Sequence, residues 1–94
     1  MLRIESLEID DHILEKIERK HDVKFEEVEE ACLSEQRHVR RGREGFYKVF
    51  GQTVSGRYVL AVLVDKGGGD WKVATARQMT NTEKRLYKKV IGGK

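Results

Sequence analysis

The sequence predicts an α+β domain in which two N-terminal helices and one C-terminal helix pack on a small antiparallel sheet. The first observation is that apolar residues recur three and four positions apart before residue 35, as they do on one face of a helix. The second is that β-branched and aromatic residues alternate after it, with glycines between the alternating segments. A chain of 94 residues suits one such domain, which we expect to span residues 1–94.

The two N-terminal helices are predicted from Asp11 to Lys20 and from Phe25 to Leu33. In the first, Ile13 and Ile17 fall on one face, and Asp10 is a residue type that caps helix N-termini. In the second, the apolar residues form one stripe and the glutamates lie outside it. Because glutamate is so frequent here, the helical part of the chain carries most of its negative charge.

Three strands are predicted to follow in a meander: Gly45 to Thr53, Tyr58 to Val64 and Trp71 to Arg77. The pair Ser55-Gly56 suits a tight hairpin turn between the first two strands. The glycines at 67–69 suit a second turn between the last two strands. Since the middle strand is apolar at nearly every position, we expect it to be the central strand, covered on both faces.

A final helix is predicted from Asn81 to Ile91. Thr80 followed three residues later by Glu83 matches a capping box, in which each residue bonds the backbone N–H of the other. The basic residues of this helix are expected to stay exposed to water. Its inward-facing residues are expected to be Leu86, Val90 and Tyr87.

The charges of the chain separate at about residue 34. Residues 1–34 carry five Lys and Arg against eleven Asp and Glu, whereas residues 35–94 carry fourteen against five. The first part therefore has a net charge of −6 and the second of +9, although the whole chain is only +3. This separation predicts one acidic and one basic surface. Nucleic-acid phosphates are the commonest partners of a basic surface, because each contact with Lys or Arg releases condensed counterions.

The composition disfavours several classes of protein. Cys32 is the single cysteine, so no internal disulfide can form, and no stretch approaches the ~20 apolar residues that cross a bilayer. The N-terminus has no signal-peptide pattern, and we expect a cytoplasmic protein without membrane association. Three scattered histidines and one cysteine give no zinc-binding spacing, and the glycines at 67–69 lack the Lys-Ser/Thr of a P-loop. We therefore expect no metal or other cofactor.

Four segments, spread over roughly residues 7 to 89, resemble segments of the BrnT family of bacterial toxins in the same order. Lys20 to Glu27, KHDVKFEE, is similar to the family's KHGVSFEEA-like segment. Asp22 replaces the family's glycine there, and aspartate also tolerates the left-handed conformation of a helix end. Leu7 to Asp10 resembles the opening strand, and Gly56 to Asp65 resembles a central strand that begins with Gly-Arg. Thr75 to Arg77, with the residues that follow, resembles the terminal Ser-Ala-Arg and helix segment.

Members of the BrnT family are small ribonucleases of the RelE superfamily. The resemblance therefore implies a RelE-like fold and the toxin of a type II toxin–antitoxin system, which cleaves RNA without a metal ion and so inhibits translation. It also implies a protein partner, a cognate ribbon-helix-helix antitoxin. Cleavage by attack of the ribose 2′-OH needs a group that takes a proton, a group that gives one, and cations that stabilise the phosphorane.

The candidate catalytic residues are Arg77, His21, Arg57 and Lys48. Arg77 matches the family's Ser-Ala-Arg position and is the first candidate for a phosphate ligand; the alternative is a salt bridge at a sheet edge. His21 matches the Lys-His position and can titrate near neutrality, or it serves only to end a helix. An arginine typical of the family before Gly51 is absent here, so either Lys48, Arg43 or Arg57 replaces it or the chain is less active.

The candidate RNA-binding residues are Lys20, Arg40, Arg41 and Arg43. Three of them lie in the run from Arg37 to Arg43, which has four arginines in seven residues and is suited to grip phosphates. The alternatives for this run are a solvated loop, or pairing with the glutamates of the second helix or with an acidic partner. Lys20 can equally serve to end a helix. The alternative function is a non-catalytic module on the same fold that binds nucleic acid or protein.

Overall fold

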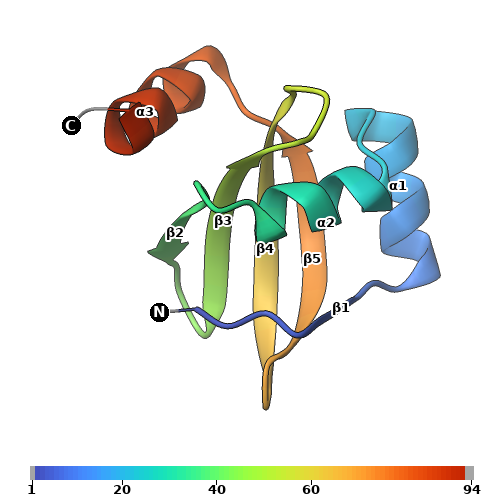
Figure 1. Cartoon of the computed structure of the whole chain (residues 1–94). Helices are drawn as coiled ribbons and strands as arrows, with labels where there is room; N and C mark the ends of the chain where they lie inside the picture. Colours follow the sequence, from blue (N-terminus) through green and yellow to red (C-terminus); the bar gives the residue numbers. More distant parts are fainter. Residues whose placement is uncertain (1, 93–94) are drawn as a thin grey trace.

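A five-stranded mixed sheet forms the middle of the protein (Figure 1). The strands are β1 (Ser6–Glu8), β2 (His38–Arg41), β3 (Phe46–Gln52), β4 (Tyr58–Gly67) and β5 (Asp70–Gln78). Their order across the sheet is β1-β5-β4-β3-β2, with β1 parallel to β5 and all other neighbours antiparallel. The structure, a computed structural model, describes residues 2–92.

Three helices flank the sheet: α1 (Asp11–His21), α2 (Phe25–Leu33) and α3 (Asn81–Gly92). α1 packs against β5, and α2 packs against β3 and β4. In Figure 1, α3 lies toward the β2 edge of the sheet and α1 toward the opposite edge. The α+β class predicted from the sequence is confirmed by this arrangement. Among the helices of residues 2–92, none combines the length and the apolar character needed to cross a membrane.

The sheet differs from the predicted one at both edges. β1 pairs in parallel with β5, with Leu7 opposite Trp71, so the sheet is mixed rather than wholly antiparallel. A strand of three residues is too short for an alternating pattern to appear, so periodicity indicates only an extended segment there. The opening strand that the resemblance implies at Leu7 to Asp10 overlaps β1. β2 lies within the arginine-rich run, which we had interpreted as an RNA-binding segment or a loop. It is a strand because Val39 packs on the core and the backbone pairs with β3.

The central strand β4 divides its apolar residues between the two faces of the sheet. Val59, Ala61 and Leu63 are fully buried beneath α1 and α2. Leu60 points to the other face, where it joins Phe50 in a second, smaller core. The prediction that this strand is central is confirmed by the strand order.

Gly51 of β3 allows α2 to lie directly on the sheet. A Cβ atom built at this position would stand 2.1 Å from the carbonyl oxygen of Ala31 in α2. Helix and strand backbones are therefore in contact, a separation that only glycine permits.

α3 covers only one end of the second face of the sheet. Tyr87 is its buried residue and packs with Phe50, Leu60 and Met79. The Tyr87 hydroxyl donates a hydrogen bond to the backbone carbonyl of Gln36 at 3.1 Å. This contact covers only one end of the face on which α3 lies. Other side chains of the same face remain exposed or half-buried.

The start of α3 is as predicted, but its inward face is not. The Thr80 N–H donates to Glu83 Oε1 at 2.9 Å, and the Glu83 N–H donates to Thr80 Oγ1 at 3.1 Å, which forms the predicted capping box. The expectation that Leu86 and Val90 face inward is wrong, since they are 52% and 51% exposed. Tyr87 and the partly buried Ile91 make the contact with the small core on the sheet, and Leu86 and Val90 turn toward an adjoining hollow.

Replacing Gly51 with alanine tests the close approach of α2 to the sheet. Because the new Cβ would overlap the Ala31 carbonyl, Gly51→Ala is expected to lower the free energy of unfolding by about 2 to 3 kcal/mol. Urea denaturation followed by circular dichroism measures this loss. Gly92→Ala is the control, since a Cβ there meets nothing within 4 Å. Equal stability of the Gly51 variant and the control would contradict the packing described here.

Candidate functional site

A hollow of about 720 Å³ opens between α3 and the part of the sheet formed by β2 and β3. It lies on the face that α3 covers only in part. Its volume is in the range of sites that hold small ligands or portions of larger ones. The lining combines three cations with histidine, glutamate, aromatic and aliphatic side chains: His38, Arg40, Arg41, Gly42, Lys48, Phe50, Glu83, Leu86, Tyr87 and Val90.

Arg40 of β2 and Lys48 of β3 give the hollow a positively charged wall. They are register partners, so their side chains leave the same face of the sheet from adjacent positions. Like charges placed opposite each other on neighbouring strands repel. Among residues 2–92, neither of the two forms an ion pair with a carboxylate. The pair is therefore a centre of uncompensated positive charge, which suits an anion.

His38 brings an imidazole to the same hollow. It precedes Arg40 by two residues on β2, and alternate residues of a strand share one face. Its ring centroid lies 5.9 Å from that of Phe50. An imidazole both takes and gives a proton near neutral pH. Cations, a proton-transfer group and an apolar surface are thus gathered around one cavity.

Arg77 points to the same face of the sheet, but its guanidinium is bound by Glu83 of α3. Its Nη1 and Nη2 donate to the two carboxylate oxygens at 2.7 and 2.9 Å. These hydrogen bonds are the main cause that lowers the pKa of Glu83 to about 2, against the opposing effect of burial. Glu83 itself lines the hollow, so the ion pair forms part of its border. The salt bridge that was the alternative interpretation of Arg77 is present.

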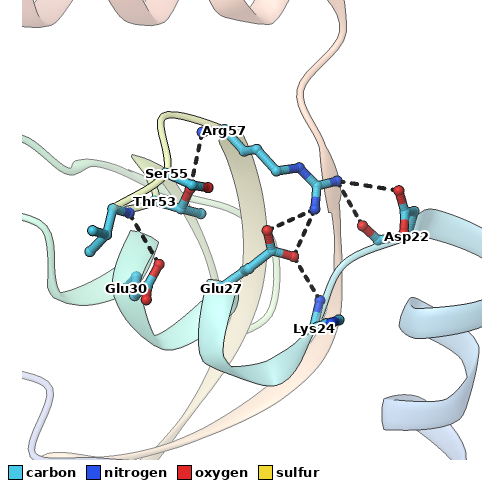
Figure 2. A network of polar contacts seen from close by, with 8 residues as sticks. Asp22, Lys24, Glu27, Glu30, Thr53, Ser55 and Arg57 are labelled. Carbon is cyan, nitrogen blue, oxygen red and sulfur yellow. Dashed lines mark hydrogen bonds and ion pairs between the residues drawn. The ribbon is translucent and has the colours of Figure 1, made fainter.

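Arg57 precedes β4 and is bound to α2 and to the end of α1, as Figure 2 shows. Its Nη1 donates to both carboxylate oxygens of Glu27 at 2.8 and 2.7 Å, and its Nη2 donates to the Asp22 carbonyl at 2.7 Å. Burial alone would raise the pKa of Glu27, but hydrogen bonds from the Lys24 N–H and from Arg57 outweigh it and keep that pKa below its usual value. Asp22 has φ 54°, the left-handed conformation expected where the family has glycine. Arg57 thus links the start of β4 to α2 and to the end of α1.

The fold places this chain beside one known toxin. It is similar to the crystal structure of the Brucella abortus ribonuclease toxin BrnT, with a TM-score of 0.70 over 81% of this chain and 97% of that chain. The chain has the BrnT toxin fold. Only 16% of the residues are identical, so the likeness concerns the fold. No protein-family model matches the sequence, and no curated protein matches it. The resemblance to the BrnT family predicted from the sequence is confirmed at the level of the fold.

On this BrnT-like fold, the predicted site residues fall into separate groups. Lys48, Arg40 and Arg41 line the hollow together. Arg77 borders it through its ion pair with Glu83. Four of the predicted residues therefore lie in the lining of one cavity or at its border.

The other predicted site residues lie elsewhere. Lys20 and His21 end α1, which packs on the opposite face of the sheet. Arg57 is held by α2. Arg43 is exposed in the turn between β2 and β3. The roles predicted for these residues remain predictions, and the geometry does not bring them into the hollow.

The arginine-rich run is divided between a helix contact and the hollow. Arg37 donates to the carbonyl of Cys32 at 2.8 Å, at the end of α2, and also to the carbonyl of Leu2. This contact satisfies a carbonyl that the helix end leaves unpaired. In the described part of the chain, the run forms no ion pair with the glutamates of α2, which was one alternative. Arg40 instead faces the hollow, whereas Arg41 only borders it, because the Arg41 side chain leaves the opposite face of β2 toward the ring of Tyr47.

His38, Glu83 and Tyr87 line the hollow but were not predicted to belong to the site. The period of two in the segment His-Val-Arg-Arg was a usable signal for His38, because it places that side chain on the same strand face as Arg40. No comparable signal existed for the other two, since their position depends on where α3 docks. Among the described residues, no three His, Cys, Asp or Glu side chains are grouped so as to hold a metal ion.

The ion pair of Glu83 with Arg77 should make the stability of the protein depend on pH. The carboxylate has a pKa of about 2 in the folded chain and 4.5 ordinarily, so its contribution is full above pH 4.5 and is lost as the pH falls toward 2. Because Arg77 is 39% exposed, solvent screening reduces this contribution to about 1 to 2 kcal/mol. Glu83→Gln is expected to lose that amount near neutral pH and to match the wild type near pH 2.

Urea denaturation across this pH range measures the effect. Glu15→Gln is the matched control, because Glu15 pairs with Arg19 at 3.7 Å on a helix surface where both side chains are mostly exposed. Such surface pairs contribute little. Equal losses in the two variants, or a loss in Glu83→Gln that does not change with pH, would contradict the assigned ion pair.

Proposed function

We propose that this chain is the toxin component of a type II toxin–antitoxin system, a metal-independent endoribonuclease that cleaves RNA and so inhibits translation. One observation carries the proposal. Arg40 and Lys48 lie side by side, without a carboxylate partner among the described residues, in a hollow that also contains His38. A phosphodiester is an anion that such a pair suits, and the toxin fold adds support.

The chemistry of the proposed reaction uses the RNA itself as the nucleophile. The ribose 2′-oxygen forms a bond to the adjacent phosphorus, and the bond from phosphorus to the 5′-oxygen breaks. A base takes the proton of the 2′-OH, and an acid gives a proton to the departing 5′-oxygen. The products are a 2′,3′-cyclic phosphate and a 5′-OH. Because the nucleophile belongs to the substrate, no metal-activated water is needed.

The side chains around the hollow have complementary roles in this proposal. Lys48 and Arg40 bind the phosphate and stabilise the additional negative charge of the phosphorane. His38 takes the proton of the 2′-OH and then gives it to the departing 5′-oxygen. It has the role that the resemblance assigned to His21, since His38 lines the hollow and His21 does not. Arg77 is fixed by Glu83 at the border, where its charge is largely compensated and its role is to hold the start of α3 beside the hollow.

The second candidate function is a non-catalytic module that binds nucleic acid. The observation that favours it is the state of the two arginines first expected to be catalytic. Arg77 is bound by Glu83, and Arg57 is bound by Glu27. Each guanidinium is therefore compensated by a carboxylate and binds a phosphate less strongly. In this case the hollow binds RNA without cleaving it.

The proposed partner is a cognate ribbon-helix-helix antitoxin. A protein that covered the hollow would exclude RNA from Arg40 and Lys48. Leu86 and Val90 support such a contact, because they are half-exposed aliphatic side chains on the α3 wall of the same hollow. An interface of this kind, with an apolar centre next to charged groups, resembles protein–protein interfaces in general.

Cleavage of labelled RNA by the purified protein tests the proposed function. The wild type is expected to cleave equally with and without EDTA. Lys48→Ala and His38→Ala are each expected to lower the cleavage rate about 100-fold, because each removes a group that acts on the transition state. Lys16→Ala, which removes a charge from the exposed face of α1, is the control and should keep the wild-type rate.

Three outcomes would contradict parts of this proposal. RNA binding without any cleavage would favour the non-catalytic module. Cleavage that stops in EDTA would exclude the metal-independent mechanism. A Lys48→Ala variant as active as the wild type would remove the hollow from the reaction.

A further inference from the structure

A second group of cations gathers on the other side of α3. Lys84 and Lys88 are four residues apart, so they lie on one face of the helix. Both ammonium groups lie over the ring of Tyr58, with Nζ 5.8 Å and 5.1 Å from the ring centroid. The ring itself is held edge to face against Tyr87, with centroids 5.9 Å apart. Tyr58 thus draws two like charges to one point on the surface.

This arrangement has an electrostatic cost that a ligand would remove. Two lysines four residues apart on a helix repel each other, and here they converge on one ring. The face of the tyrosine ring attracts each ammonium only modestly. Among residues 2–92, neither lysine has a carboxylate within ion-pair distance. An anion placed between the two ammonium groups would offset their repulsion.

The surface beside Lys88 is hollowed and has polar side chains at its border. A second hollow of about 210 Å³ lies there, and Gln36, Gln52 and Lys88 contribute polar side chains to its lining. Amide N–H groups can donate hydrogen bonds to phosphate oxygens. The hollow is smaller than the roughly 300 to 1,000 Å³ of pockets that enclose a whole small molecule. A single phosphate of a longer chain fits this size better than a complete nucleotide.

We propose that Lys84, Lys88 and Tyr58 form a second phosphate-binding subsite for RNA, which rests on the proposed function and is separate from the cleavage hollow. The two hollows share Tyr87 and lie on either side of α3. RNA held at Arg40 and Lys48 therefore continues past α3, and a backbone phosphate away from the scissile bond binds the lysine pair. This subsite contributes to affinity and takes no part in bond breaking.

The test measures binding of an RNA whose 2′-OH groups are methylated, so that it binds without being cleaved. In the variant Lys84→Gln/Lys88→Gln, the slope of log K against log salt is expected to become shallower by about 0.7, because one phosphate contact with a single strand is lost. This change corresponds to about 5-fold weaker binding near 0.1 M salt if the curves meet at 1 M. The cleavage of unmodified RNA should show a raised KM and an unchanged kcat.

The matched control is Arg85→Gln/Lys89→Gln, which removes two charges at the same spacing from the same helix. These residues are exposed, and the contacts to Tyr58 come from Lys84 and Lys88. The control is expected to keep nearly the wild-type slope and KM. Thermal unfolding should show both variants folded, since neither removes an ion pair of the described residues or a buried side chain.

The remaining outcomes overturn one proposal or both. If both double variants lose the same affinity, the effect is one of net charge and no subsite exists. If the wild type binds and cleaves RNA while Lys84→Gln/Lys88→Gln is unchanged, the subsite is wrong and the proposed function stands. If the wild type binds no RNA at all, both proposals fail.

Discussion

The partial cover of one sheet face by α3 is the constraint on which the rest of the structure depends. α1 and α2 close one face completely, with Gly51 allowing α2 to touch the sheet. On the other face, Tyr87 provides a single anchor, and Arg77 with Glu83 fixes the start of the helix. Further along that face stand Arg40 and Lys48. Since burying unpaired charges is costly, a helix that extended the cover over them would lose more than it gained. The hollow is the part of this face that α3 leaves uncovered.

The acidic and basic parts of the chain also take different positions around the sheet. The glutamate-rich helices pack on the face away from the hollow, so their carboxylates do not neutralise its cations. Two glutamates pair instead with arginines at strand ends. Glu27 binds Arg57 and Glu83 binds Arg77, and each pair ties a strand end to a helix. Arginines near a strand end therefore divide into those that hold the fold together and those that remain without a carboxylate.

The sequence allowed the helices and the central strand to be predicted well, because those elements have strong local patterns. The bounds of α2 and the capping box of α3 agree with prediction, since both depend on residues close together in the chain. β2 was not predicted as a strand, because only Val39 in its four residues is apolar. Leu86 and Val90 were placed wrongly because their exposure depends on how α3 docks, which no pattern within the helix specifies.

The candidate site was harder to predict than the fold for the same reason. The contact of Arg57 with Glu27 joins residues 30 positions apart, and nothing local distinguishes Arg57 from an arginine that binds phosphate. Glu83 was expected to cap α3, but its second role as the partner of Arg77 needs the helix to return over β5. Resemblance to a family supplied the fold correctly and placed candidate residues on both faces of the sheet. The structure places Arg40 and Lys48 in the hollow and His21 and Arg57 outside it.

The most direct test of this account is an NMR titration of the labelled protein with the 2′-O-methylated RNA. The backbone amide signals of β2 and of β3 around Lys48 are expected to shift, because RNA phosphates bind in the hollow beside them. Those of α1 and α2 are expected to stay in place. Shifts concentrated at Lys20 and His21, with β2 and β3 unaffected, would contradict the account by moving the RNA to the opposite face.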